Sequence, residues 1–358
     1  MTRILVIGGG IAGLSVAARL SADAEVTVIE AEDSLGYHAS GRSAALIEQN
    51  YGAPSVQALN RASVDYLRGH DGGYLTPRGL MIVANDKDKE AFDADVAAMG
   101  VHRISVADAC AKVPVLDPGY VTLAAWHADA HDIDTDRLLQ GFARTLRANG
   151  GRVVVSQRIT AISHEDALWS LQSADDEWST DILVNAAGAW ADEVAGLAGI
   201  RPMGIVPYRR SMARVAAPAG HDVSGWPMFF GVSESWYAKP DAGALLVSPA
   251  DEDPVDPHDA WAEDMTLAEG IALYEEVVTE PVSRMLSNWA GLRSFAPDRT
   301  LVLGPDPDIP SFVWCAGQGG YGMQTAPAAS QLVADMVFGR PPRLAANSIA
   351  ALRPERLR

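Results

Sequence analysis

Three glycines near the amino terminus, Gly8, Gly10 and Gly13, follow the spacing G-x-G-x-x-G, and an acidic residue, Glu30, comes 17 residues after the last of them. Gly8 permits a tight turn, Gly10 lets the backbone approach a pyrophosphate, and Gly13 allows a helix to pack closely on a strand. A carboxylate such as Glu30 accepts hydrogen bonds from ribose hydroxyls. The spacing predicts a dinucleotide site, although a glycine-rich strand-to-helix turn alone would show the same three glycines.

The elements that would position these residues are also present in order. Residues 4–7 form a short apolar run, apolar residues between 14 and 20 recur at helical spacing, and residues 25–30 form a second run that ends in the acid. Strand, glycine turn, helix and strand make a βαβ unit whose helix N-terminus faces the phosphates.

The glycine motif occurs in both NAD and FAD sites, so the rest of the chain has to distinguish them. Residues 36–45 are small, polar and without periodicity, where an NAD dehydrogenase would continue with regular βα repeats. Such a segment suits an extended peptide against a bulky ring system and favours FAD. A second glycine-rich turn, residues 317–322, follows the apolar run 312–316 and precedes an alanine-rich helix. It predicts another helix N-terminus directed at the cofactor.

Composition excludes several classes of protein. The chain of 358 residues carries 28 basic and 46 acidic side chains, a formal charge of −18, which argues against nucleic acid as a partner. At 48% hydrophobic residues it can bury a sizeable core. No apolar window reaches the length of a membrane span or of a signal peptide. Two distant cysteines, Cys110 and Cys315, predict a reducing compartment and therefore the cytoplasm.

The predicted fold class is α/β with an α+β second unit. A helix from Asp134 to about residue 149 and strands at 153–155, 159–162 and 181–188 would extend the opening sheet, with an exposed hairpin over 169–179. A Rossmann-like FAD-binding domain would comprise residues 1–52, 131–205 and 289–358. A discontinuous, mixed-sheet substrate-binding domain would comprise residues 53–130 and 206–288. The acidic run 251–259 is interpreted as a solvated loop.

The chain resembles the FAD-dependent D-amino acid oxidase superfamily over essentially its whole length. Three segments carry this resemblance: residues 8–13, the sequence LVNAAGAW at 183–190, and residues 317–324. Within this superfamily the chain is most similar to bacterial D-arginine dehydrogenases, in segments 36–45, 239–243, 248–250, 289–293 and 318–322. The resemblance implies non-covalently bound FAD. The cofactor-binding residues it implies are Gly8, Gly10, Ala12, Gly13, Glu30, Ala31, Gly41, Arg42, Ser43, Ala44, Ile159, Gly188, Gly319, Gly320, Tyr321, Gly322, Met323 and Gln324.

The resemblance also implies roles at the substrate. Arg210 and Arg293 match two arginines that hold the substrate carboxylate, which a guanidinium fork binds in a bidentate manner. Tyr237 matches a tyrosine that hydrogen-bonds the same carboxylate, and Tyr51 an active-site tyrosine. The Gly320 carbonyl matches the group that receives the ammonium. Ion-paired structural arginines and a core aromatic at Tyr237 are the alternatives.

Two positions depart from the family pattern. Leu46 stands where the family has a histidine, and Leu80 stands where an ungapped reading places a glutamate that grips an arginine side chain. Burying a cation without a partner is costly, so we expect neutral, apolar side chains to be preferred over D-arginine. Residues 243–247 lack the lysine that sarcosine-type oxidases use with oxygen, which favours a dehydrogenase over an oxidase.

The sequence therefore predicts an FAD-dependent D-amino acid dehydrogenase or oxidase. Hydride transfer from Cα to flavin N5 would give an imino acid, then a 2-oxo acid and ammonia. The partners would be a small amino acid and an electron acceptor: a quinone, a carrier or O2. The alternatives are oxidation of sarcosine-like secondary amines or glycine, and a non-catalytic flavin-carrying subunit. His127 and His131 have the spacing of a zinc pair but no helical pattern, so no metal is predicted, and Cys315 is assigned to packing.

Overall fold

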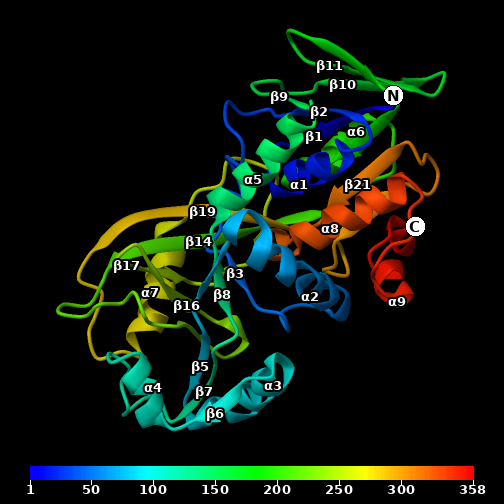
Figure 1. The fold of residues 1–358 in the computed structure, drawn as a ribbon. Coiled ribbons are helices and arrows are strands. Elements are labelled where there is room, and N and C mark those ends of the chain that lie inside the picture. Colours follow the sequence, from blue (N-terminus) through cyan, green and yellow to red (C-terminus); the bar gives the residue numbers. More distant parts are fainter.

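The computed structural model describes all 358 residues and shows two lobes (Figure 1). One lobe is built on a six-stranded sheet that is parallel except for the edge strand β20. Its strands, in spatial order, are β20 (Val302–Pro305), β21 (Phe312–Ala316), β13 (Ile182–Asn185), β1 (Arg3–Ile7), β2 (Glu25–Ile29) and β9 (Arg152–Val154). Its helices are α1 (Ile11–Leu20), α2 (Pro54–Gly69), α5 (Thr135–Ala148), α6 (Ala191–Leu197), α8 (Gly322–Val337) and α9 (Ala346–Ala350).

Alternation along β1 explains the layers of this lobe. Ile4 and Val6 belong to the core that includes α1, α5 and α8, whereas Leu5 and Ile7 belong to the core on the opposite face. Successive side chains of a strand point to opposite faces, so an uninterrupted apolar run such as 4–7 is buried on both sides. The predicted α/β class and the βαβ opening are confirmed.

One predicted strand lies elsewhere. Residues 159–162 do not extend the main sheet, because the chain there enters β10 (Ala161–Glu165), which pairs with β11 (Leu168–Gln172) and β12 (Glu177–Thr180) in a separate antiparallel sheet. The predicted hairpin is this sheet, and it is not wholly exposed. Trp169 and Leu171 on β11 are fully buried against the main sheet. Local alternation showed a strand but not the sheet it joins.

The second lobe is built on a nine-stranded mixed sheet. Its strands are β5 (Leu80–Ala84), β6 (His102–Ile104), β7 (Leu123–His127), β14 (Val206–Ala216), β15 (Met228–Gly231), β16 (Tyr237–Asp241), β17 (Ala244–Ser248), β18 (Asp253–Pro254) and β19 (Met285–Phe295), with α3 (Lys89–Met99), α4 (Val106–Lys112) and α7 (Asp264–Glu275) around it. The long strands β14 and β19 pair over most of their length and run between the lobes (Figure 1). A small separate sheet of β3 (Leu46–Ile47), β8 (His131–Ile133) and β4 (Leu75–Pro77) lies near the centre of the molecule.

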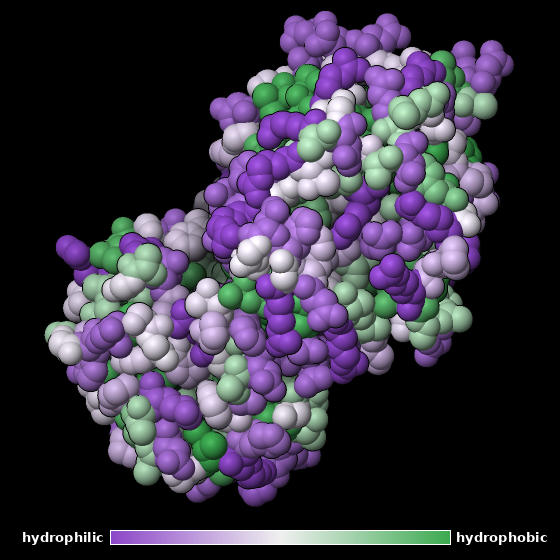
Figure 2. Space-filling view, in the orientation of Figure 1, coloured by the Kyte–Doolittle hydropathy of each residue, from purple (hydrophilic) through white to green (hydrophobic).

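The predicted domain boundaries remain a prediction; one of them falls within a strand, and another precedes a helix that packs on the opposite lobe. Residue 289 lies inside β19, and α2, which opens the segment 53–130, packs against α8 of the first lobe. On the surface, hydrophilic residues predominate and hydrophobic ones are scattered (Figure 2). None of the helices has the length and apolar character needed to cross a bilayer.

Candidate active site

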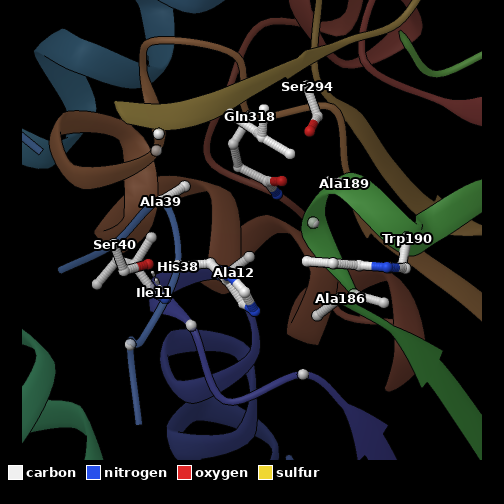
Figure 3. A pocket seen from close by; sticks show the side chains of 18 of the residues that line it. Ile11, Ala12, His38, Ala39, Ser40, Ala186, Ala189, Trp190, Ser294 and Gln318 are labelled. Atoms are coloured by element: carbon white, nitrogen blue, oxygen red, sulfur yellow. Dashed lines mark hydrogen bonds between the residues drawn. The ribbon is translucent and has the colours of Figure 1, made fainter. Parts of the chain in front are cut away.

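A cavity of about 360 Å³ lies where β1, α1, α8 and the strands β14 and β19 meet. In Figure 3, His38, Ala39 and Ser40 come from one segment and Ala186, Ala189 and Trp190 from another, and both groups face the same space. The predicted cofactor residues that line the cavity are Gly8, Gly10, Ala12, Glu30, Ala31, Arg42, Ser43, Ala44, Ile159, Gly188, Gly319, Gly320, Gly322 and Met323.

The glycine turn fits a dinucleotide. A Cβ on Gly8, whose φ is +109°, would lie 2.4 Å from the Ala186 carbonyl oxygen, and a Cβ on Gly13 would lie 1.8 Å from the Gly8 carbonyl oxygen. Only glycine permits this close approach of strand and helix, which brings the N-terminus of α1 to the cavity. The N-terminus of α8, at Gly322 and Met323, reaches the same cavity. Both helix ends supply positive potential for anionic phosphates.

Four predicted cofactor residues do not line this cavity. Gly13 and Gly41 act through the backbone, since a Cβ on Gly41 would lie 2.6 Å from the Gly36 carbonyl oxygen. Tyr321 precedes α8 and packs edge-on against Tyr51, with ring centroids 5.3 Å apart. Gln324 is buried in the first turn of α8 and lines an inner chamber instead.

Glu30 directly follows β2, which ends one residue earlier than predicted, and it lines the cavity. One oxygen accepts a hydrogen bond from the Gly9 amide at 2.6 Å, and the other accepts one from the Glu32 amide at 2.9 Å. These bonds fix the carboxylate beside the glycine turn. Because each carboxylate oxygen has a second lone pair, the group retains capacity for a ribose hydroxyl.

Residues 37–42 are held against the cavity by a distant loop. Arg42 pairs with Asp259 and donates to the Ala260 carbonyl at 2.8 Å, while the Tyr37 hydroxyl donates to Asp259 at 3.2 Å. His38 belongs to the same segment and also lines the cavity. Its ring lies 4.7 Å from that of Trp190, which also lines the cavity and whose role was not predicted.

An inner chamber of about 100 Å³ opens beyond this cavity. The residues that line both spaces, and so form the neck between them, are Ser43, Ala44, Tyr237, Arg293, Gly320 and Met323. Of the residues predicted to act at the substrate, Tyr51, Tyr237, Arg293, Gly320, Gln324, Leu46 and Leu80 line the chamber. Arg210 lines only the outer cavity.

Arg293, on β19, forms no hydrogen bond or ion pair with another side chain. Its guanidinium lies against Gly320, where a Cβ would come within 3.2 Å of Cζ. Burial by itself would lower the pKa of Arg293, but the nearby phenols and the carboxylates of Glu234 and Glu252 outweigh burial and raise the pKa. The chamber therefore contains a permanent cation without a partner of its own.

Arg210, on β14, differs from Arg293 because the protein already occupies its guanidinium. Nε donates to the Asp251 carbonyl at 2.9 Å, and Nη2 pairs with Glu252 at 3.1 Å, while Nη1 is buried without a partner. The acidic run is thus not a solvated loop at its start: Asp251 accepts hydrogen bonds from the amide and hydroxyl of Ser211 at 2.6 and 2.8 Å. The run lines neither cavity, but it holds Arg210, which lines the outer one.

Sequence reasoning missed Glu234, which lines the same chamber as Arg293. Its carboxylate accepts a hydrogen bond at 3.0 Å from the hydroxyl of Tyr51. Burial and the nearby carboxylate raise the pKa of Tyr51, so the phenol stays protonated and acts as a donor. Ser233 and Glu234 have φ of 55° and 53°, a region that side chains other than glycine rarely adopt. No local sequence pattern signals this turn.

The remaining wall of the chamber is largely apolar and includes Leu46 and Leu80, the two departures from the family pattern. A second carboxylate, Glu48, also lines it, but protein groups already occupy that side chain. Glu48 lies 2.8 Å from His127 Nε2 and accepts the Asn50 amide at 2.9 Å.

Two further features noted in the sequence line neither cavity. His131 Nδ1 contacts the Asp129 carbonyl at 2.9 Å, whereas His127 contacts Glu48, so the two histidines with the spacing of a zinc pair have different partners. Cys315 is fully buried in β21, and burial raises its pKa to about 12. It lines neither cavity, as expected of a packing residue.

The chain matches known proteins over almost its whole length. The model of the family described as FAD dependent oxidoreductase matches residues 3–336. Glycine oxidase from Pseudomonas aeruginosa is 27% identical over 373 residues, covering 95% of this chain and 96% of that protein. FAD-dependent oxidoreductase domain-containing protein 1 from Bos taurus is 25% identical over 409 residues, covering 94% of this chain and 81% of that protein.

Among solved structures, glycine oxidase from Geobacillus kaustophilus superposes with a TM-score of 0.83 at 18% identity, covering 98% of each chain. At this identity the match shows the fold alone. The resemblance inferred from the sequence thus holds at the level of the superfamily, and the relatives named here are not D-arginine dehydrogenases.

Proposed function

The chain belongs to the family of FAD-dependent oxidoreductases, and on this premise we propose that it oxidises the carbon–nitrogen bond of an amino acid with a free carboxylate. FAD is its cofactor, and the glycine turn, Glu30 and the N-termini of α1 and α8 would hold it in the outer cavity. When bound, FAD supplies the two-electron acceptor of the reaction.

The observation that carries this proposal is the pair of opposite charges in the inner chamber. Arg293 has no protein partner, and Glu234 stands in the same small space without forming an ion pair with it. A cation and an anion held apart are complementary to a zwitterion, whose carboxylate and ammonium carry the opposite charges. Neither a hydrocarbon nor an alcohol substrate would compensate the two charges.

The chamber residues would orient and desolvate such a substrate. Arg293 offers a fork of N–H donors to the carboxylate, and Tyr237 lies beside it on the neck. The Gly320 carbonyl, at the same neck, is available to the amino group. Fixing both polar groups leaves the substrate carbon in one orientation toward the outer cavity.

We retain a neutral side chain as the preferred substrate class. Glu48 is engaged by His127, and Glu234 is the anion assigned to the substrate ammonium, so neither carboxylate is left for a side-chain cation. The rest of the wall contains Leu46, Leu80, Met99, Met228 and Phe230. The D enantiomer follows from the family resemblance and is part of the proposal.

The second candidate is oxidation of glycine or of an N-substituted glycine. It is favoured by the small volume of the chamber, about 100 Å³, and by the glycine oxidases among the relatives. Both candidates use the same carboxylate anchor. They differ in whether a side chain on Cα is accepted.

Anaerobic mixing of the yellow holoenzyme with a panel of amino acids tests the proposal. We expect flavin bleaching with D-leucine, D-methionine or D-phenylalanine, and weaker bleaching with D-arginine or D-lysine. Bleaching by sarcosine or glycine alone would support the second candidate, and unchanged colour with every amine would support a flavin-carrying subunit. Dye reduction compared with peroxide formation in air then separates dehydrogenase from oxidase.

A further inference from the structure

Lys239 is a buried cation that the proposed reaction does not use. It lies on β16, and only 9% of its side chain is exposed. Residues i and i+2 of a strand project to the same face, so Lys239 follows Tyr237 on the face that borders the cavities. It lines neither cavity itself but stands directly behind the neck.

Its ammonium contacts the backbone of residues 36–45, the segment beside the outer cavity that we call the cofactor loop. Nζ donates to the Ala44 carbonyl at 2.6 Å and lies 3.5 Å from the Ala45 carbonyl. Ala44 lines both the outer cavity and the chamber, so a shift of its backbone changes the opening between them. A charge-assisted hydrogen bond is about twice as strong as a neutral one, which suits a contact that fixes an otherwise irregular segment.

Asp132 is the counter-ion of Lys239, and it connects this contact to two other segments that border the chamber. Asp132 Oδ1 lies 2.6 Å from Nζ, and its backbone pairs with Leu46 in the small central sheet. The other oxygen, Oδ2, accepts from Arg78 Nε at 2.7 Å. Arg78 in turn donates to the Ser224 and Trp226 carbonyls, both at 2.8 Å, just before β15.

We propose that Lys239 is a positioning residue that holds the Ala44–Ala45 backbone and thereby fixes the neck between the cofactor cavity and the chamber. Burial opposes the charge and lowers the pKa of Lys239, whereas Asp132 favours the charged form. A buried cation costs free energy unless it is paired, and here each of its partners is a group that shapes the site.

The test compares K239M holoenzyme with R214M holoenzyme. Arg214, on β14, pairs with Asp241, which lies two residues after Lys239 on β16. Arg214 forms no hydrogen bond with residues 36–45. We expect K239M to shift the absorption bands of bound flavin, to change its midpoint potential and to raise the FAD dissociation constant about tenfold. R214M should match the wild type in all three. These readouts need no substrate and are independent of the proposed function.

Two further variants separate the carbonyl contact from the ion pair. K239Q retains an N–H donor and should restore the flavin spectrum in part, and it carries the test where K239M does not fold. D132N keeps the lysine beside Ala44 and should perturb the spectrum less than K239M. A K239M protein of lowered thermal stability whose flavin spectrum and FAD affinity equal those of R214M overturns the proposal. So does a D132N protein as perturbed as K239M.

Discussion

Replacing Arg293 by methionine should remove the carboxylate anchor of the proposed substrate. The guanidinium has no competing protein partner, so the substrate carboxylate would receive its hydrogen bonds undivided. A hydrogen bond to a charged group contributes about 1.5–3 kcal/mol, and a bidentate contact has two. We therefore expect kcat/KM of R293M to fall by roughly 10²- to 10³-fold, which corresponds to about 3–4 kcal/mol.

Matched variants and substrates identify the cause of the loss. R293K keeps the charge but loses the fork and should retain more activity than R293M. Arg210 already donates to Asp251 and pairs with Glu252, so R210M should lose less than R293M. The corresponding amine without a carboxylate should react slowly with wild type and R293M alike. That comparison is a double-mutant cycle between the arginine and the carboxylate.

Stopped-flow reduction of bound flavin under anaerobic conditions measures the effect without interference from the electron acceptor. The flavin spectrum of R293M before mixing serves as the control for an intact cofactor site. If R293M slowed the amine as strongly as the amino acid, or if R210M were the more damaging change, the assignment of the anchor to Arg293 would be refuted.

Two other changes test separate parts of the site, and a third tests the stability of the first lobe. E234Q removes the anion that complements the substrate ammonium and should raise KM about tenfold, or about 1.4 kcal/mol, with kcat less affected. E269Q, on the exposed face of α7, is the control. An unchanged KM in E234Q contradicts the zwitterion argument. G13A places a Cβ 1.8 Å from the Gly8 carbonyl oxygen and should yield colourless protein, whereas G196A, with no atom within 4 Å, should bind FAD normally. Burial alone would raise the pKa of Asp306, but hydrogen bonds from Trp314, the Asp308 amide and Arg358 lower this pKa below 3.8. The ionised carboxylate therefore stabilises the fold above pH 3.8, and this stabilisation is lost as the pH falls through the folded-state pKa. D306N should therefore lower the free energy of unfolding in urea by about 1.5–3 kcal/mol at pH 7, and a difference from wild type that does not shrink below pH 3.8 would contradict this.

The part of the site that local sequence predicts is the part that local sterics determine. The turn at Gly8 and Gly13 can be predicted from the sequence because a Cβ at either position would collide with the backbone, either a few residues away or next to the adjacent strand. Arg293 and Tyr237 were identified through family resemblance and do lie together at the neck. Glu234 was not, because it stands on a short turn of positive φ and its partner, Tyr51, is 183 residues away in the chain.

The contacts of three arginines show why residue type and net charge alone could not identify the arginine that binds the substrate carboxylate. Arg209 and Arg210 on β14 and Arg293 on β19 look equivalent in the sequence, and all three enter the same pair of strands. The acidic segment 251–263 folds back and neutralises the first two, through Asp253 and Glu263 for Arg209 and through Glu252 for Arg210. Arg293 alone is left facing the chamber without a counter-ion. In a protein of net charge −18, the acidic side chains thus favour anion binding at one position, because among these three arginines they leave only Arg293 uncompensated, where a substrate carboxylate can reach it.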